Sequence, residues 1–116
     1  MKRFTLLVLL AVTLGVQAQQ GSLRGRVVDA RSGENIEYAN IALLKAADSS
    51  LVNGTVSESN GSFRLTAPYG RYLVRVTFIG YDAYFHAQPV VLGESRKEVN
   101  LGKLQLRMSV TMMEAV

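Results

Sequence analysis

The sequence predicts an all-β protein, specifically an antiparallel β-sandwich of about seven strands. Short runs alternate apolar and polar residues, and residues 72–78 (YLVRVTF) are the clearest of them. Turn signals separate these runs at regular spacing, and Asn60-Gly61 is the sharpest because both residues accept a positive φ. No stretch after residue 18 shows a convincing helical period. Many short alternating strands at regular spacing are typical of a sandwich.

Residues 1–18 have the pattern of an export signal. Lys2 and Arg3 form a basic start, residues 4–16 are uncharged and mostly apolar, and Ala18 supplies a small residue for signal peptidase. The apolar stretch is shorter than the roughly 20 residues that span a bilayer. We therefore expect cleavage between Ala18 and Gln19 and an exported protein, with residues 19–106 forming one domain.

The charge of the chain argues against nucleic acid as a partner. The 13 basic residues exceed the nine acidic ones, but removal of Lys2 and Arg3 leaves 11 against nine. The remaining cations are scattered singly along the chain, apart from Arg96-Lys97, and do not form a phosphate-tracking run. The sequence has no cysteine, which excludes disulfides, thiol chemistry and a lipidated N-terminus.

Alternation also predicts the strands and their buried faces. We expect strands over residues 22–29, 39–45, 84–92 (interrupted by Pro89) and 98–106, and an antiparallel meander over residues 54–81. Phe63, Val74 and Val76 should be buried, whereas Arg64 should face solvent. Gly25 lies in mid-strand, which indicates a bulge or a neighbour packed closely over it. Gly102 shifts the alternation of the last strand.

The last ten residues, 107–116, have a different character. They contain three methionines and no turn signal, so we interpret them as a linker into a longer natural chain. We expect this segment to be loosely attached to the sandwich from Met108 onward. Its end is a candidate partner-binding tail, formed by Met113, Glu114, Ala115 and Val116, that could add a strand to the edge of a partner's sheet.

Four blocks of residues resemble a known family in their order and spacing. They are residues 25–41 (GRVVD to ANI), residues 54–65 (GTV with NGSFRL), residues 68–81 (PYGRY to IGY) and residues 101–106 (LGKLQL). Together these blocks resemble the carboxypeptidase-regulatory-like domain at the N-terminus of TonB-dependent outer-membrane receptors. The resemblance implies a transthyretin-like sandwich on the periplasmic side of the outer membrane, ahead of a plug and barrel.

Little in the sequence indicates catalysis. His86 is the one histidine, and zinc peptidases need clustered ligands, so we expect neither a metal nor another cofactor. The carboxylates Asp29, Glu34, Glu58 and Asp82 lie in or beside turns, where they cap backbone N–H groups.

Two further kinds of chemistry have candidate residues in the sequence. Tyr69 and Tyr84 could be exposed and bind a glycan. An isopeptide bond could use only Lys45, Asn100 and Glu58, and we expect none.

The sequence thus favours a non-enzymatic periplasmic module of a TonB-dependent receptor, with a structural or docking role. Its expected partners are the barrel and plug of the same receptor and the TonB energy-coupling machinery. The alternative is a free-standing secreted or surface sandwich that binds glycan or protein.

Overall fold

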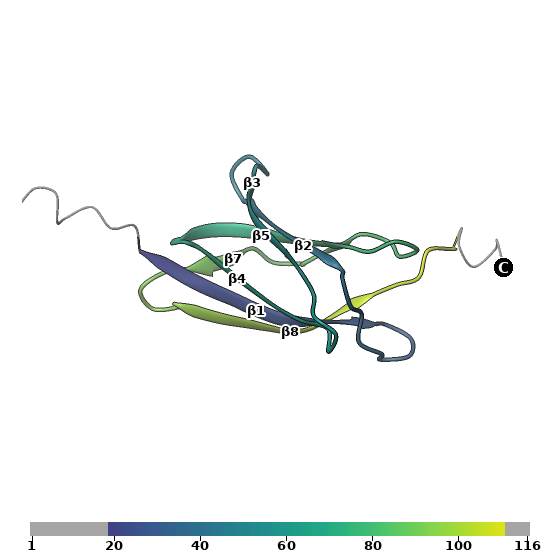
Figure 1. Ribbon diagram of the computed structural model, residues 1–116. Coiled ribbons are helices and arrows are strands. Elements are labelled where there is room, and N and C mark those ends of the chain that lie inside the picture. The colour runs from purple at the N-terminus through teal and green to yellow at the C-terminus, as the bar shows by residue number, and fades with distance from the viewer. Residues whose placement is uncertain (1–18, 111–116) are drawn as a thin grey trace, which may run out of the picture.

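The computed structural model describes residues 19–110, and eight strands form there (Figure 1). They are β1 (Gln20–Asp29), β2 (Asn40–Lys45), β3 (Leu51–Val56), β4 (Ser62–Pro68), β5 (Gly70–Thr77), β6 (Tyr84–Phe85), β7 (Val90–Leu92) and β8 (Glu98–Leu106). The predicted strand over residues 84–92 is two short strands, and Pro89 lies in the gap between them. The described residues include no helix long and apolar enough to cross a membrane.

Two sheets pack face to face, as the sequence predicted (Figure 1). One sheet has the order β4-β1-β8, and the other has the order β3-β2-β5-β6, with β7 also paired to β5. The core lies between them and contains the side chains predicted to be buried. Phe63 is 4% exposed, Val74 is 1% exposed and Val76 is fully buried, whereas Arg64 faces solvent. Burying one such side chain stabilises the fold by roughly 1.5–3 kcal/mol.

The predicted meander over residues 54–81 is wrong. The strands β3 and β5 belong to one sheet and β4 to the other, so the chain crosses between sheets at both turns. The Asn60-Gly61 turn still forms, and Gly61 has a φ of +80°. The carbonyl of Gly61 accepts a 2.8 Å hydrogen bond from the Val27 amide of β1. The turn thus carries the chain from the edge strand β3 to a strand that pairs with β1.

Gly25 is a site of close packing. A Cβ atom there would lie 2.9 Å from two carbon atoms of the Phe63 ring, so the ring occupies the space that a side chain would fill. Gly25 is the partner of Phe63 across β1 and β4. The sequence-based expectation of a close neighbour at this glycine is therefore confirmed.

The first and last strands run parallel, side by side. Ser22 is opposite Glu98 at one end of the ladder, and Asp29 is opposite Leu106 at the other. The described chain consequently begins at one end of the sandwich and leaves at the opposite end (Figure 1). At about 3.3 Å per residue, β8 separates these two ends by roughly 30 Å.

A bulge interrupts this ladder at Gly102, as the shifted alternation indicated. Arg24 is opposite Asn100, but Arg26 is opposite Lys103, so β8 has one more residue than β1 between the two pairs. Gly102 adopts a φ of +73°, and its amide donates a 2.9 Å hydrogen bond to Oδ1 of Asn100. The extra residue turns Lys103 outward and leaves Leu104 and Leu106 in the core.

Candidate functional site

A group of side-chain hydrogen bonds lies at the end of the sandwich at which the described chain leaves. Tyr81 follows the Gly80 turn after β5, and its hydroxyl donates a 2.6 Å hydrogen bond to Oδ2 of Asp29 at the end of β1. The other carboxylate oxygen, Oδ1, accepts from the amides of Arg31 and Ser32, at 2.7 and 2.9 Å. The carboxylate of Asp29 therefore holds the turn after β1 and ties it to the turn after β5.

These contacts change the acidity of both groups. The hydrogen bond from Tyr81, with the backbone amides of Ser32 and Arg31, lowers the pKa of Asp29 to about 2. The same hydrogen bond, together with partial burial and the charge of Asp29, raises the pKa of Tyr81 to about 12. Asp29 is therefore ionised and Tyr81 neutral at any physiological pH, so the pair is a structural link rather than an acid–base couple.

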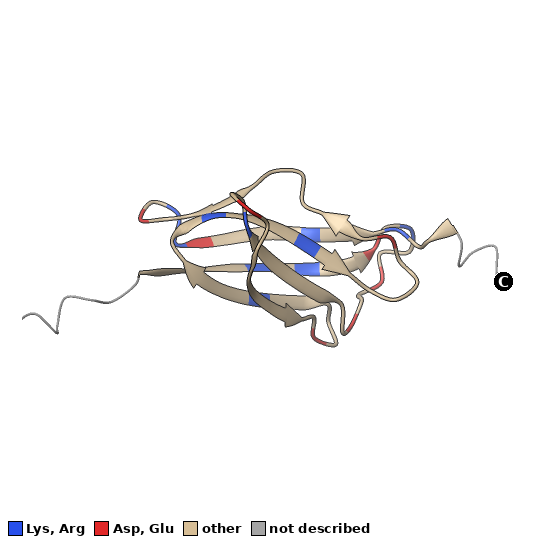
Figure 2. Cartoon of the chain, turned by 90° about the horizontal axis from the view of Figure 1, so that it is seen from above, with Lys and Arg blue, Asp and Glu red and all other residues tan. Residues whose placement is uncertain are grey.

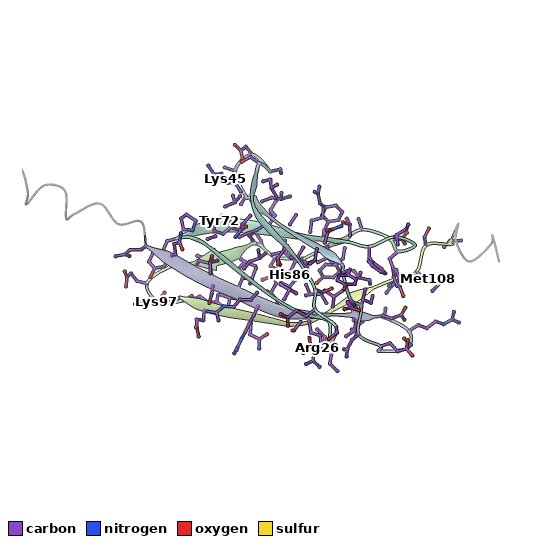
Figure 3. The ribbon with its side chains drawn as sticks, in the orientation of Figure 1. Arg26, Lys45, Tyr72, His86, Lys97 and Met108 are labelled. Atoms are coloured by element: carbon purple, nitrogen blue, oxygen red, sulfur yellow. The ribbon has the colours of Figure 1, made fainter. Side chains whose placement is uncertain are left out.

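The segment after β8 is attached to this link. The carbonyl of Arg107 accepts a 2.9 Å hydrogen bond from the Asp82 amide, and the Ser109 amide donates one of 2.9 Å to the Gly80 carbonyl. Met108 is bridged to Tyr81 and lies at this end of the molecule (Figure 3). The expectation of loose attachment from Met108 is thus wrong for Met108 and Ser109. Backbone pairing to the 80–82 turn holds them, and the sequence shows no sign of it.

An open hollow of about 790 Å³ lies beside the link. Asp29, Arg31, Tyr81, Arg107 and Met108 contribute to its lining. Met108 is about half exposed, so the hollow combines an apolar side chain with charged ones. The Asp29 carboxylate in this lining is held by three hydrogen bonds, from the Arg31 and Ser32 amides and the Tyr81 hydroxyl.

The two ends of the chain predicted to be functional fall largely outside the described residues. Ala18 and the tail residues Met113, Glu114, Ala115 and Val116 are not described. Gln19 is the first described residue, and its carbonyl accepts a 3.0 Å hydrogen bond from the Tyr69 amide.

The tyrosines proposed as an exposed glycan platform are not exposed. Tyr69 and Tyr84 are both half-buried and pack against the core. The hydroxyl of Tyr84 lies 3.0 Å from Nδ1 of His86, so His86 is a half-buried strand-end residue with a neighbouring hydroxyl. Within residues 19–110, the aromatic side chains that do face solvent are Tyr38 and Phe85, each 66% exposed, and alternation did not single them out.

The candidate isopeptide set is not brought together. Asn100 and Glu58 line one open depression beside β1, β3, β4 and β8, whereas Lys45 lies at the exposed end of β2. Figure 3 shows Lys45 on the opposite side of the sandwich from Arg26, another residue of that depression. Within residues 19–110, no group of three or more His, Asp or Glu side chains is placed to hold a metal ion.

Sequence reasoning missed the buried Ser57. Its hydroxyl donates a 2.6 Å hydrogen bond to the Ile36 carbonyl and accepts one of 2.9 Å from the Ala39 amide. Its own amide and carbonyl pair with Ala39 and Tyr38. A serine after a strand carries no signal of such a role, because its partners lie 18 and 21 residues earlier in the chain.

Comparison with known protein families assigns this sandwich to one family. The model of the carboxypeptidase regulatory-like domain matches residues 22–104, which include nearly every strand residue described above. The chain belongs to that family. No curated protein matches the sequence.

Several solved structures share the fold at low sequence identity. The Bacillus anthracis TIE protein is 18% identical with a TM-score of 0.64, over 77% of this chain and 17% of that one. The group B streptococcus pilus 2b backbone protein is 15% identical with a TM-score of 0.63, over 84% of this chain and 44% of that one. Wild-type catechol 1,2-dioxygenase of Acinetobacter radioresistens is 10% identical with a TM-score of 0.61, over 83% and 54%. This chain thus spans about half or less of these proteins, and the likeness concerns the fold.

Proposed function

We propose that the chain is a non-enzymatic periplasmic module of a TonB-dependent outer-membrane receptor, acting as an in-line spacer and docking domain. The resemblance of the four sequence blocks to the N-terminal domains of such receptors supports the receptor assignment, and the family match supports the type of domain. The basic and apolar residues 1–18 support export.

The parallel pairing of β1 with β8 is the observation that carries the spacer role. It sets the start and the end of the described chain at opposite ends of the sandwich. A domain with this arrangement extends a polypeptide by its own length rather than branching from it. The Arg107 carbonyl accepts from the Asp82 amide and the Ser109 amide donates to the Gly80 carbonyl, and these two hydrogen bonds fix the direction in which the chain leaves.

In this proposal, the segment after residue 110 leads towards the plug, and residues 113–116 belong to the part that the energy-coupling machinery contacts. The open hollow beside Asp29 and Tyr81 would bind part of a partner protein. A carboxylate fixed by three hydrogen bonds and an exposed Met108 give such a surface one charged and one apolar contact.

The reading frame beyond Val116 tests the receptor assignment. A continuing frame that encodes a plug and a barrel supports it, and a stop codon directly after Val116 contradicts it. Cell fractionation gives an independent check, because the receptor should sediment with the outer membrane, whereas a free-standing module should appear in the medium or at the cell surface.

A free-standing surface module that binds glycan or protein is the second candidate. The fold likeness to the pilus 2b backbone protein and to BcpA, the major pilin subunit of Bacillus cereus, favours it. An enzymatic role is the third candidate, and the fold likeness to catechol dioxygenases, at 10–11% identity, is the observation that favours it. Elemental analysis of the purified protein separates this last class, since a stoichiometric metal would contradict the non-enzymatic proposal.

A further inference from the structure

The outer face of the β4-β1-β8 sheet carries four cations in a compact group. Arg64 of β4 is directly opposite Arg24 of β1, and Arg26 of β1 is directly opposite Lys103 of β8. All four side chains are exposed, and all four line one shallow depression of about 600 Å³. We call this group the cationic face. Figure 2 shows Lys and Arg within the strands, whereas Asp and Glu lie mostly in the turns.

Grouping four cations on one face lowers the stability of the fold, which suggests that the group has a function other than stability. Side chains directly opposite each other on neighbouring strands have Cβ atoms about 4.5–5.5 Å apart, and like charges in such pairs are destabilising. None of the four cations has a carboxylate within 4.0 Å among the described residues. Glu58 is the acidic residue in the lining of the depression, and among the described residues no cation lies within 4.0 Å of its carboxylate. The repulsion between Arg24 and Arg64 is therefore left without a paired counter-charge in this part of the chain.

The bulge in β8 completes the group. Without the extra residue before Lys103, that side chain would take the inward parity of Leu101. With it, Lys103 lies on the outer face beside Arg26. Asn100 also faces outward there, and its Oδ1 is occupied by the Gly102 amide, so its NH₂ group remains to donate to a ligand. Bulges that re-aim a side chain are common beside functional sites.

We propose that the cationic face binds the phosphorylated head groups of an anionic membrane surface. Guanidinium groups hold phosphate oxygens through paired N–H donors, and the compact group presents three guanidiniums and one ammonium to one plane. An open face can contact many head groups in one plane at once, whereas it cannot enclose a single soluble ion. Each Lys or Arg near an anionic surface contributes about 1 kcal/mol of binding, so four together give a weak but additive attachment.

The surroundings disfavour the other polyanions. The depression has no exposed aromatic ring in its lining, because Phe63 is buried, so neither sugar rings nor nucleobases have a stacking platform. Protein interfaces rely on buried aromatic and apolar anchors, and Val56 is the one exposed large apolar side chain in this lining.

The test is co-sedimentation of the exported protein with phosphatidylcholine vesicles, with and without phosphatidylglycerol. We expect binding that requires phosphatidylglycerol and weakens with salt. The double variant Arg24→Gln/Arg64→Gln should bind about 30-fold more weakly, the equivalent of two surface cations. The matched control is Arg71→Gln/Arg75→Gln, which removes the same charge from exposed positions of β5 in the other sheet. The control should lose less than about threefold. All variants have the same N-terminus, so any affinity of the N-terminus for lipid is the same in each and does not affect the comparison between them.

Several outcomes would overturn the proposal. Equal losses in the two double variants would mean that net charge alone attracts the protein. Binding without phosphatidylglycerol would exclude head-group recognition. Displacement from vesicles by inorganic pyrophosphate at low concentration would show that a soluble phosphate is the ligand, and equally strong displacement by polyglutamate would indicate an acidic peptide. Thermal melts verify folding of each variant, and the single variant Arg64→Gln, at an exposed edge-strand position, serves if the double variant does not fold.

Discussion

Asp29 and Tyr81 lie 52 residues apart in the chain and share a 2.6 Å hydrogen bond at the end of the sandwich where the chain leaves. This bond joins the turn after β1 to the turn after β5, and residues 107–109 pair with the latter. The geometry of the exit therefore depends on a contact between two turns that belong to different sheets.

The Asp29–Tyr81 pair predicts a dependence of stability on acid. The hydrogen bond from Tyr81 lowers the pKa of Asp29 to about 2 in the folded protein, well below its ordinary value. Its contribution is therefore full above about pH 4 and is lost as the pH falls through 2. Tyr81→Phe should raise the pKa of Asp29 towards its ordinary value and flatten this acid loss. Urea unfolding across the same pH range measures it. Tyr38→Phe, at a hydroxyl without a side-chain hydrogen bond in the described chain, is the control. Identical slopes for the two variants would refute the link.

Gly25→Ala should destabilise the protein by about 1–3 kcal/mol, because a new Cβ would overlap the Phe63 ring and force it to shift. Gly93→Ala is the matched control, since a Cβ there meets no atom within 4 Å. Chemical denaturation of both variants gives the comparison. If Gly25→Ala is as stable as Gly93→Ala, the close packing described for the first strand does not exist.

Phe63 and Arg64 are neighbours on opposite faces of β4, and their truncation should separate core from surface. Phe63→Ala removes a ring from the core and should cost about 3–5 kcal/mol, enough to unfold much of a domain this size. Arg64→Ala should cost less than about 0.5 kcal/mol. Equal changes in thermal melts would mean that β4 faces the other way.

Ser57→Ala should cost about 1–3 kcal/mol, because the buried Ile36 carbonyl and Ala39 amide both lose a partner. Ser59→Ala, in the exposed turn that follows, should leave stability within about 0.5 kcal/mol. Calorimetry distinguishes the two. A neutral Ser57→Ala variant would show that water replaces the hydroxyl and that the serine does not hold the start of β2.

The sequence predicted the faces of the strands more reliably than their partners. Alternation identifies which of Phe63 and Arg64 is buried, because side chains alternate between the two faces of any strand. It carries no information on whether a turn returns the chain to the same sheet. The Asn60-Gly61 turn has hairpin chemistry, yet it connects strands of different sheets.

The functional surfaces were harder to predict for the same reason. The link between Asp29 and Tyr81, the role of Ser57 and the attachment of Met108 all depend on pairings between distant segments. The cationic face looks like scattered single charges in the sequence, and only the register of β4, β1 and β8 gathers them. Gly102 was the one local signal of this surface, because a glycine that shifts alternation marks a bulge.

The in-line arrangement of β1 and β8 is tested most directly by pulling on single molecules. The chain has no cysteine, so attachment points can be introduced one pair at a time. Force between Gln19→Cys and Val110→Cys loads the parallel β1–β8 ladder in shear, with all its hydrogen bonds sharing the load. Force between Gln19→Cys and Ser95→Cys, at one end of the same ladder, peels the strands apart pair by pair. The account predicts a clearly higher unfolding force for the first pair of attachment points, and an equal or lower force would contradict it.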